Sequence, residues 1–184
     1  MSWQLDPGHT YIGFTGRHLM VATVRGAFEQ FSGTVEFDEQ DITRSKVDIQ
    51  IEAASVNTHN ASRDEHFRSA DFFDVEHSPY ITFKSKRVIM QDAHHGQLVG
   101  DLTIRNITRE VVLDGEYSGV SHTPWNTYSA GFSLSGKVNR KEWDMKWNMV
   151  LAGGGLAASD EITIAIDLEL TNPVATTQAK AASA

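Results

Sequence analysis

Histidines and carboxylates are the side chains of this sequence that could carry out acid–base chemistry or bind a metal. Its 184 residues include 8 His and 24 Asp or Glu, with no Cys. His18 and His66, together with nearby acids, could serve as acid and base on a lipid-like substrate. The sequence contains no Gly-x-Ser-x-Gly elbow, no phosphate-binding glycine loop ending in Lys-Ser/Thr and no His-Glu-x-x-His. We therefore predict that the protein is not an enzyme and has no catalytic residue.

A metal site has little support from the histidines. His59, His66 and His77 could meet only through the fold, and the adjacent His94 and His95 would point to opposite faces of an extended chain. The lack of Cys also removes disulfides and thiolate ligands. We predict no metal site and no cofactor.

The segment 61–74 is predicted to be one short helix in a chain that otherwise has the pattern of strands. Ser62 and Glu65 have the spacing of a capping box, and Asp64 adds negative charge to the first turn. Phe67 and Ala70 share one face of such a helix. This segment would hold aromatic side chains against the strands.

Alternating apolar and polar residues predict about eight or nine half-buried strands. The alternation is clear from Val47 to Glu52 and from Ile162 to Thr171. Turn residues separate the strands, so most neighbours should be antiparallel. The expected strands cover residues 10–24, 27–38, 45–56, 80–91, 97–105, 109–120, 127–139, 143–151 and 161–171. Such an all-β set either stacks as a sandwich or closes as a barrel, and only a barrel can enclose a large cavity.

Large adaptable side chains alternate in the predicted strand 143–151. Trp143, Met145, Trp147 and Met149 share one face. Indole and thioether groups suit the wall of a site for a flexible apolar guest, although a plain core could use them too. The pattern leaves both interpretations open.

Composition narrows the class of protein. The chain is 40% hydrophobic and carries a net charge of −8, which fits one domain and disfavours nucleic acid and anionic lipid surfaces. The N-terminus has no secretory signal, so we expect a cytoplasmic protein, or a periplasmic or secreted one if a signal was removed. No apolar run approaches the ~20 residues of a membrane span, so no membrane insertion is expected. We predict a domain over 1–172 and a disordered tail over 173–184.

Several motifs taken in order resemble the YceI-like family from Trp3 to about Leu170. They are Leu5–Thr10, His18, Gly26–Gly33, Arg63–Asp74, Pro79–Ser85, Gly100–Ile104 with Thr108, Arg140 ahead of Trp143, and Ser159–Glu161. The resemblance implies a lipocalin-like antiparallel β-barrel whose elongated cavity holds a polyisoprenoid or similar amphiphile. It also implies a homodimer and a link to stress responses. Asn106 replaces a usual Gly, and Asp144 follows Trp143 where Gly is commoner, so we expect the nearby cavity end to be reshaped.

The combined interpretation is a carrier or store of a long-chain isoprenoid or fatty-acid-like lipid, with access governed by the helix. His18, Arg63, His66 and Arg68 could bond the polar headgroup, or the arginines could pair with Asp64, Asp71 or Asp74 and His66 could cap the helix or lie on the surface. The rival hypotheses are an enzyme using His18 and His66 and a solid-cored interaction module. We predict these ligand-binding residues: Phe14, His18, Phe28, Phe37, His66, Phe67, Phe72, Phe83, Ile104, Phe132, Trp143, Met145, Trp147 and Met149.

Overall fold

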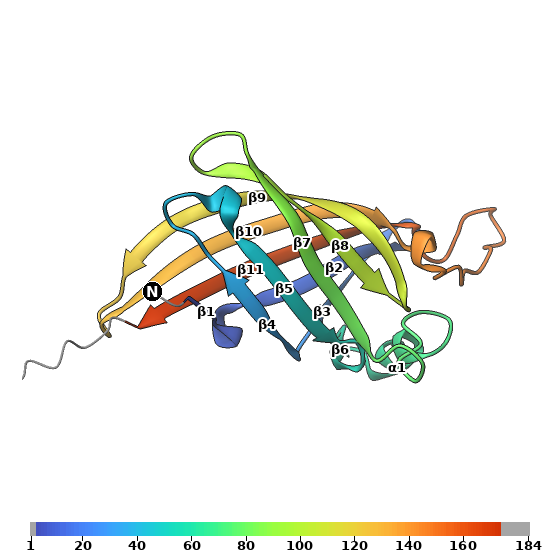
Figure 1. The fold of residues 1–184 in the computed structure, drawn as a ribbon. Coiled ribbons are helices and arrows are strands. Elements are labelled where there is room, and N and C mark those ends of the chain that lie inside the picture. Colours follow the sequence, from blue (N-terminus) through green and yellow to red (C-terminus); the bar gives the residue numbers. More distant parts are fainter. Residues whose placement is uncertain (1–2, 174–184) are drawn as a thin grey trace, which may run out of the picture.

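The structure, a computed structural model, describes residues 3–173 as one curled antiparallel sheet with a single α-helix (Figure 1). The strands are β1 (Gln4–Leu5), β2 (Tyr11–His18), β3 (Ala22–Phe28), β4 (Phe31–Glu36), β5 (Lys46–Glu52), β6 (Val56–Asn57), β7 (Tyr80–Met90), β8 (His95–Ile104), β9 (Ile107–His122), β10 (Thr127–Asn139) and β11 (Glu161–Pro173). Helix α1 covers Ala61–Arg68, and short 3-10 turns occupy Pro7–His9, Ile42–Arg44, Ala53–Ser55 and Arg140–Trp143. The predicted all-β fold with one short helix is confirmed.

The strands follow the order β4-β5-β7-β8-β9-β10-β11-β2-β3-β6, with β1 pairing β11, and every described pair is antiparallel. The sheet curls into a barrel, but its hydrogen-bonded ladder among the described strands ends at β4 and β6 (Figure 1). The predicted antiparallel barrel is therefore present as a half-barrel. Strand β1 lies between β11 and β4, where it helps to fill the remaining space.

Helix α1 is shorter than predicted and is capped by a different residue. The side chain of Asn60 accepts a hydrogen bond from the backbone N–H of Arg63, and the helix ends where Ser69 adopts extended dihedrals. Ser62 lies inside the helix, so the predicted capping box is wrong. Residues 69–77 continue as turns, since the N–H of Phe73 bonds back to the carbonyl of Phe67. These turns bring the aromatic residues after the helix back onto the barrel.

The predicted strand 10–24 is two strands, β2 and β3, joined by the three residues 19–21. Leu19 and Met20 both adopt left-handed dihedrals (φ 52° and 59°), and the N–H of Val21 bonds to the carbonyl of His18. These features define a type I′ turn, which usually contains Asn-Gly. The sequence Leu-Met carries no turn signal, so the pattern predicted one continuous strand.

The predicted strand 143–151 is also wrong. A 3-10 turn ends at Trp143, Asp144 adopts φ 61°, and the chain then runs irregularly apart from one bridge between Val150 and Leu156. The Arg140 side chain, rather than a neighbouring strand, satisfies the carbonyl of Met145. Alternation of large apolar residues was therefore present without a β-ladder.

The C-terminal end of the sheet bears on the predicted domain boundary. Strand β11 runs to Pro173, one residue into the predicted tail, and residues 174–184 lie outside the described residues, so the tail stays a prediction. Over the described part of the chain, no helix has the length and apolar character needed to cross a bilayer.

Candidate ligand-binding cavity

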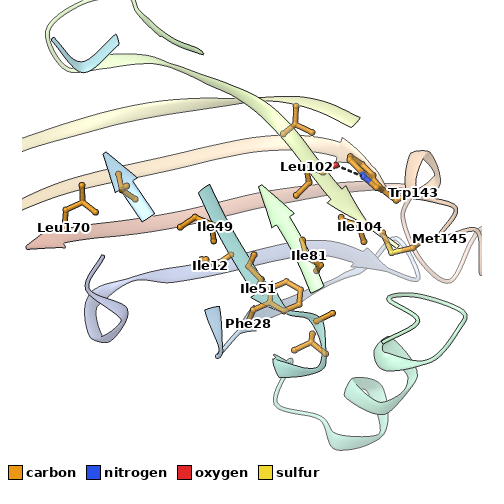
Figure 2. Close-up of a cluster of buried hydrophobic side chains, with 14 of the residues drawn as sticks. Ile12, Phe28, Ile49, Ile51, Ile81, Leu102, Ile104, Trp143, Met145 and Leu170 are labelled. Carbon is orange, nitrogen blue, oxygen red and sulfur yellow. Dashed lines mark hydrogen bonds between the residues drawn. The ribbon is translucent and has the colours of Figure 1, made fainter. Parts of the chain in front are cut away.

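A large apolar cavity of about 190 Å³ occupies the barrel interior. Its wall comes mainly from aliphatic side chains that point inward from successive strands, as Ile162, Ile164, Ile166 and Leu168 do from β11. Figure 2 shows the buried residues Ile12, Ile49, Ile51, Ile81 and Ile104 converging from four further strands. Because the inward faces of these strands are apolar, the space favours hydrocarbon over polar solutes. We call this space the large chamber.

A second cavity of about 80 Å³ adjoins the large chamber. Four residues line both cavities: Val47, Leu98, Leu134 and Leu168, which we call the waist. The smaller space, the small chamber, is walled by Phe37, Phe132 and Tyr117, whose rings pack at centroid distances of 5.0–5.8 Å. Burial raises the pKa of Tyr117, and the nearby Glu39 carboxylate adds to this effect. The interior thus holds two adjoining apolar cavities that share four wall residues.

Aromatic side chains close the large chamber at the α1 end. Phe14 packs against Phe28, Phe67 and Phe73 at centroid distances of 5.7, 6.0 and 6.4 Å. The fully buried Trp143 donates its indole N–H to the carbonyl of Leu102 over 3.1 Å (Figure 2). That bond fixes the ring orientation, so Trp143 forms a defined wall at this end of the chamber.

Arg140 is the charged residue of the large-chamber wall, and its polar atoms are held within the protein. Its Nε donates to the carbonyl of Ser159 over 2.9 Å, and Nη1 donates to the carbonyl of Met145. Nη2 lies 3.5 Å from Asp160 Oδ1, in an ion pair whose geometry leaves both atoms without a hydrogen-bond partner. Burial lowers the pKa of Arg140, and Asp160 opposes that shift. The guanidinium braces the chain around the chamber.

The segment that carries α1 is fastened to the barrel by buried polar contacts. Asp64 accepts hydrogen bonds from the backbone N–H and hydroxyl of Thr58. Arg63 donates to the Thr58 hydroxyl and carbonyl, both over 2.8 Å, and Arg68 donates to the carbonyls of Ala54 and Val56. The two arginines therefore hold the segment in place through backbone carbonyls, and the expected pairing with Asp64, Asp71 or Asp74 is wrong.

The histidines predicted to meet a headgroup lie outside the cavity wall. His66 Nε2 is 2.8 Å from Asp71 Oδ2, and the ring stands edge-on to Phe72 and Trp147. His18 is exposed at the end of β2, where it bridges to Ala158. Two other polar groups that border the cavities are bonded within the protein: the Thr10 hydroxyl accepts from the N–H of Glu169, and His94 Nδ1 lies 3.0 Å from the carbonyl of Tyr117.

The predicted ligand-binding residues fall into three groups. Eight line the large chamber: Phe14, Phe28, Phe67, Phe72, Phe83, Ile104, Trp143 and Met145. Phe37 and Phe132 line the small chamber. His18, His66, Trp147 and Met149 line neither, and Met149 is 57% exposed, so the expectation of a wholly interior Trp/Met face is corrected. Ligand contact itself stays a prediction for all fourteen residues.

Sequence reasoning missed most of the aliphatic wall. Ile162, Ile164, Ile166 and Leu168 contribute to the large chamber, although their alternation had predicted their common face. Phe73 and Arg140 were also omitted from the predicted site. The available signal was the face that each strand turns inward, which is more informative here than the aromatic residues alone.

The two departures from the family pattern occupy left-handed backbone positions. Asn106 has φ 59° and Asp144 has φ 61°, where Gly is the usual residue. Asn and Asp are among the residue types that adopt this conformation most readily after Gly. Arg105 Nη1 connects the two turns by donating to the carbonyl of Asp144 over 3.2 Å. The substitutions are thus compatible with the turns that Gly would form.

Over residues 3–173, three potential metal ligands come together at Asp6, His9 and Glu169. His9 Nδ1 lies 3.0 Å from Asp6 Oδ2, and this contact raises the pKa of His9 and lowers that of Asp6. The group stands beside the first 3-10 turn, where the contact between His9 and Asp6 lies within the turn. It does not include His59, His66 or His77, and the prediction of no metal stays untested.

Comparisons with known proteins agree on the family and the fold. A family model described as the YceI-like domain matches residues 3–170. A UPF0312 protein of Staphylococcus epidermidis is 35% identical over 170 residues, covering 92% of this chain and 96% of the relative. The YceI protein of Campylobacter jejuni is 32% identical with a TM-score of 0.75, covering 86% and 90%. A polyisoprenoid binding domain from Saccharophagus degradans, 13% identical with a TM-score of 0.68 over 94% of this chain and 99% of that one, shares the fold.

Proposed function

Because the chain belongs to the YceI-like family, we propose that it binds a long-chain apolar or amphiphilic molecule, an isoprenoid or fatty-acyl lipid, without transforming it. The structurally similar domain from Saccharophagus degradans is named for polyisoprenoid binding. That name supports the ligand class, and the family supports a binding role. The binding site in this proposal is the interior formed by the large and small chambers.

The observation that carries the proposal is the apolar lining of two adjoining chambers that share the waist residues. Val47, Leu98, Leu134 and Leu168 belong to both walls, so one hydrocarbon chain that passes them would contact apolar groups along its whole path. The Thr10 hydroxyl, His94 Nδ1 and Arg140 Nε, which border this path, are already engaged within the protein. The site therefore suits a tail, with any polar headgroup left at an opening.

Apolar transfer free energy is sufficient for such binding. Each methylene removed from water contributes about 0.8 kcal/mol, so a five-carbon isoprene unit contributes on the order of 3–4 kcal/mol before association and ordering costs. Tail length should accordingly influence affinity more strongly than headgroup identity. The rival enzyme hypothesis gains no support from the geometry, because His18 and His66 lie outside the chamber walls.

A charge placed inside the wall tests the proposed site. Ile164 lines the large chamber, whereas the neighbouring Thr163 belongs to the opposite face of β11. We expect Ile164→Asp to bind a fluorescent fatty-acid probe at least 100-fold more weakly than the parent protein, because a buried carboxylate disfavours a hydrocarbon tail. In the parent protein, a polyprenyl alcohol should displace the probe. Thr163→Asp is the matched control and should bind as the parent does.

Circular dichroism and thermal melting would verify that both variants are folded. If folded Ile164→Asp bound the probe as tightly as Thr163→Asp, the interior would not be the binding site. Failure of the parent protein to bind any long-chain compound would reject the proposed function and favour a solid-cored interaction module.

A further inference from the structure

Two neighbouring loops at the α1 end present large apolar side chains to solvent. The turn between β2 and β3 carries Leu19, Met20 and Val21, and the irregular segment after β10 carries Met149 and Val150. These five residues, the apolar tip, are 37–77% exposed. Figure 1 shows the loop between β10 and β11 and helix α1 at the same end of the barrel.

Backbone hydrogen bonds join the two loops into one projecting unit. The N–H of Leu19 donates to the carbonyl of Ala157, and the N–H of Ala157 donates to the carbonyl of Met149, each over 2.9 Å. Asn148 reinforces the contact because its side chain both donates to and accepts from the backbone of Ala158. The apolar side chains are therefore presented together on an ordered support.

The Leu19–Met20 turn is built from residues that its backbone disfavours. Both have positive φ, for which Asn-Gly is the preferred pair in a type I′ turn. Arg17 supports the turn by donating from Nη2 to the carbonyl of Met20 over 3.1 Å. The stability of the turn does not explain why two long apolar side chains occupy these positions. Contact of these side chains with a partner surface would explain it.

Charge distinguishes this tip from the rest of the molecule. The whole chain has a net charge of −8, but residues 18–24 and 147–159 contain no Asp, Glu, Lys or Arg. Arg17 and Arg25 flank the first segment, and both are exposed. A neutral apolar tip with flanking guanidinium groups complements the hydrocarbon edge and the phosphates of a zwitterionic lipid surface.

The tip is also continuous with the end of the large chamber. Phe14, Met145 and Ile162 line that chamber. Along the chain, each lies within about five residues of the tip or of its support: Phe14 of Leu19, Met145 of Met149, and Ile162 of Ala157. Trp147, between Met145 and Met149, packs against His66 of α1 at a centroid distance of 4.6 Å. A lipid surface touching the tip would therefore lie near the aromatic end of the cavity.

We propose that the apolar tip is a peripheral docking surface for a neutral phospholipid bilayer. Five partly exposed side chains make a patch of a few hundred Å², which is less than the ~800 Å² per partner that a stable protein complex usually buries. Loop tips of this kind can sit at the headgroup boundary without a spanning segment. The interaction goes beyond ligand binding and requires no bound ligand.

Co-sedimentation with ligand-free phosphatidylcholine vesicles tests the proposal. We expect the parent protein to bind and the Leu19→Asn/Met20→Gly variant to bind at least 10-fold more weakly. This variant should also melt at a higher temperature, because it places the favoured residues in the turn. A second variant, Val21→Ser/Val150→Ser, should weaken binding without altering that turn.

The matched control is Val112→Ser, since Val112 is an exposed valine on β9 outside the tip. It should bind vesicles as the parent does. Recovery of the parent protein entirely in the supernatant, or equal binding by the tip variants, would overturn the proposal. So would a parent dimer that the tip variants convert to monomers, because the tip would then be a contact between two copies. Probe binding in the cavity is measured separately, so failure here leaves the proposed function standing.

Discussion

The wall of the large chamber and the segment that carries α1 enclose the same apolar space, but different interactions hold them. The wall consists of aliphatic side chains on long paired strands, as at Ile164 and Leu102. The α1 segment is attached through Asp64, Arg63 and Arg68 to Thr58, Ala54 and Val56. Its aromatic residues Phe67 and Phe72 then complete the chamber.

This difference separates the wall residues, which shape the space, from the polar residues that hold the α1 segment, which covers one end of it. Loss of an apolar wall residue leaves a void and changes what fits inside. Loss of a buried polar contact leaves unsatisfied groups and loosens the segment without changing the wall. The two regions should therefore respond differently to substitution, in stability and in ligand binding.

Removal of the Trp143 ring should produce the largest effect. Trp143→Ala deletes a fully buried side chain and the bond to Leu102, so we expect a loss of about 3–5 kcal/mol in the free energy of unfolding. Trp125→Ala, at a residue that is 81% exposed, is the control and should stay within about 0.5 kcal/mol of the parent. Urea unfolding measures both. Equal effects would contradict the assignment of Trp143 to the chamber wall.

Loss of the Asp64 carboxylate should give the next largest effect. Asp64→Ala leaves the N–H and hydroxyl of Thr58 without their acceptor, at a cost of about 1–3 kcal/mol. Asp71→Ala removes an exposed carboxylate from the same segment and should cost less than about 1 kcal/mol. Hydrogen exchange should show faster opening of residues 58–74 for Asp64→Ala only. If residues 58–74 exchanged equally slowly in both variants, the buried polar contacts of Asp64 would not be what holds the α1 segment in place.

A bulky residue at the waist should change ligand selection more than stability. Leu134→Trp would narrow the passage between the chambers, so we expect affinity for a long prenyl chain to fall about tenfold, or about 1.4 kcal/mol. A short chain that fits the large chamber should keep its affinity. Ser135→Trp, on the outer face of β10, is the control. Equal losses for long and short chains would show that the tail does not cross the waist.

The smallest effect concerns an exposed carboxylate that resembles Asp64 in its bonding. Asp92 Oδ1 accepts from the backbone N–H groups of His94 and His95, and these bonds lower the pKa of Asp92 to about 2. Because the pKa is lowered in the folded state, the contribution is present above the usual value near 4 and is lost as pH falls toward 2. NMR titration should place the Asp92 midpoint near 2. A midpoint near 4 would mean that the turn is not held this way.

The sequence predicted the barrel well because alternation of side chains reports directly on half-buried strands. The presence of a helix in this segment was also predictable, but Ala70, which the prediction placed on one face with Phe67, lies beyond the end of the helix at Arg68. The strand expected over 143–151 failed because period-two alternation arose from a segment organised by the Arg140 side chain. The Leu19–Met20 turn was invisible because neither residue signals positive φ.

The site was less predictable than the fold. Whether Trp143 and Met145 bordered a cavity or a plain core depended on how distant strands curl, which no local pattern specifies. From the sequence, the arginines of 63–68 could bond either a headgroup or the protein. In the folded chain they donate to the carbonyls of Ala54, Val56 and Thr58. Long-range closure therefore determined what the local patterns left open.

Native mass spectrometry of freshly purified protein, with mass spectrometry of its organic extract, tests the central claim most directly. The account predicts a long-chain isoprenoid or lipid that binds one per chain and is displaced by added polyprenyl alcohol. An interior that purifies empty and takes up no long-chain compound would contradict it.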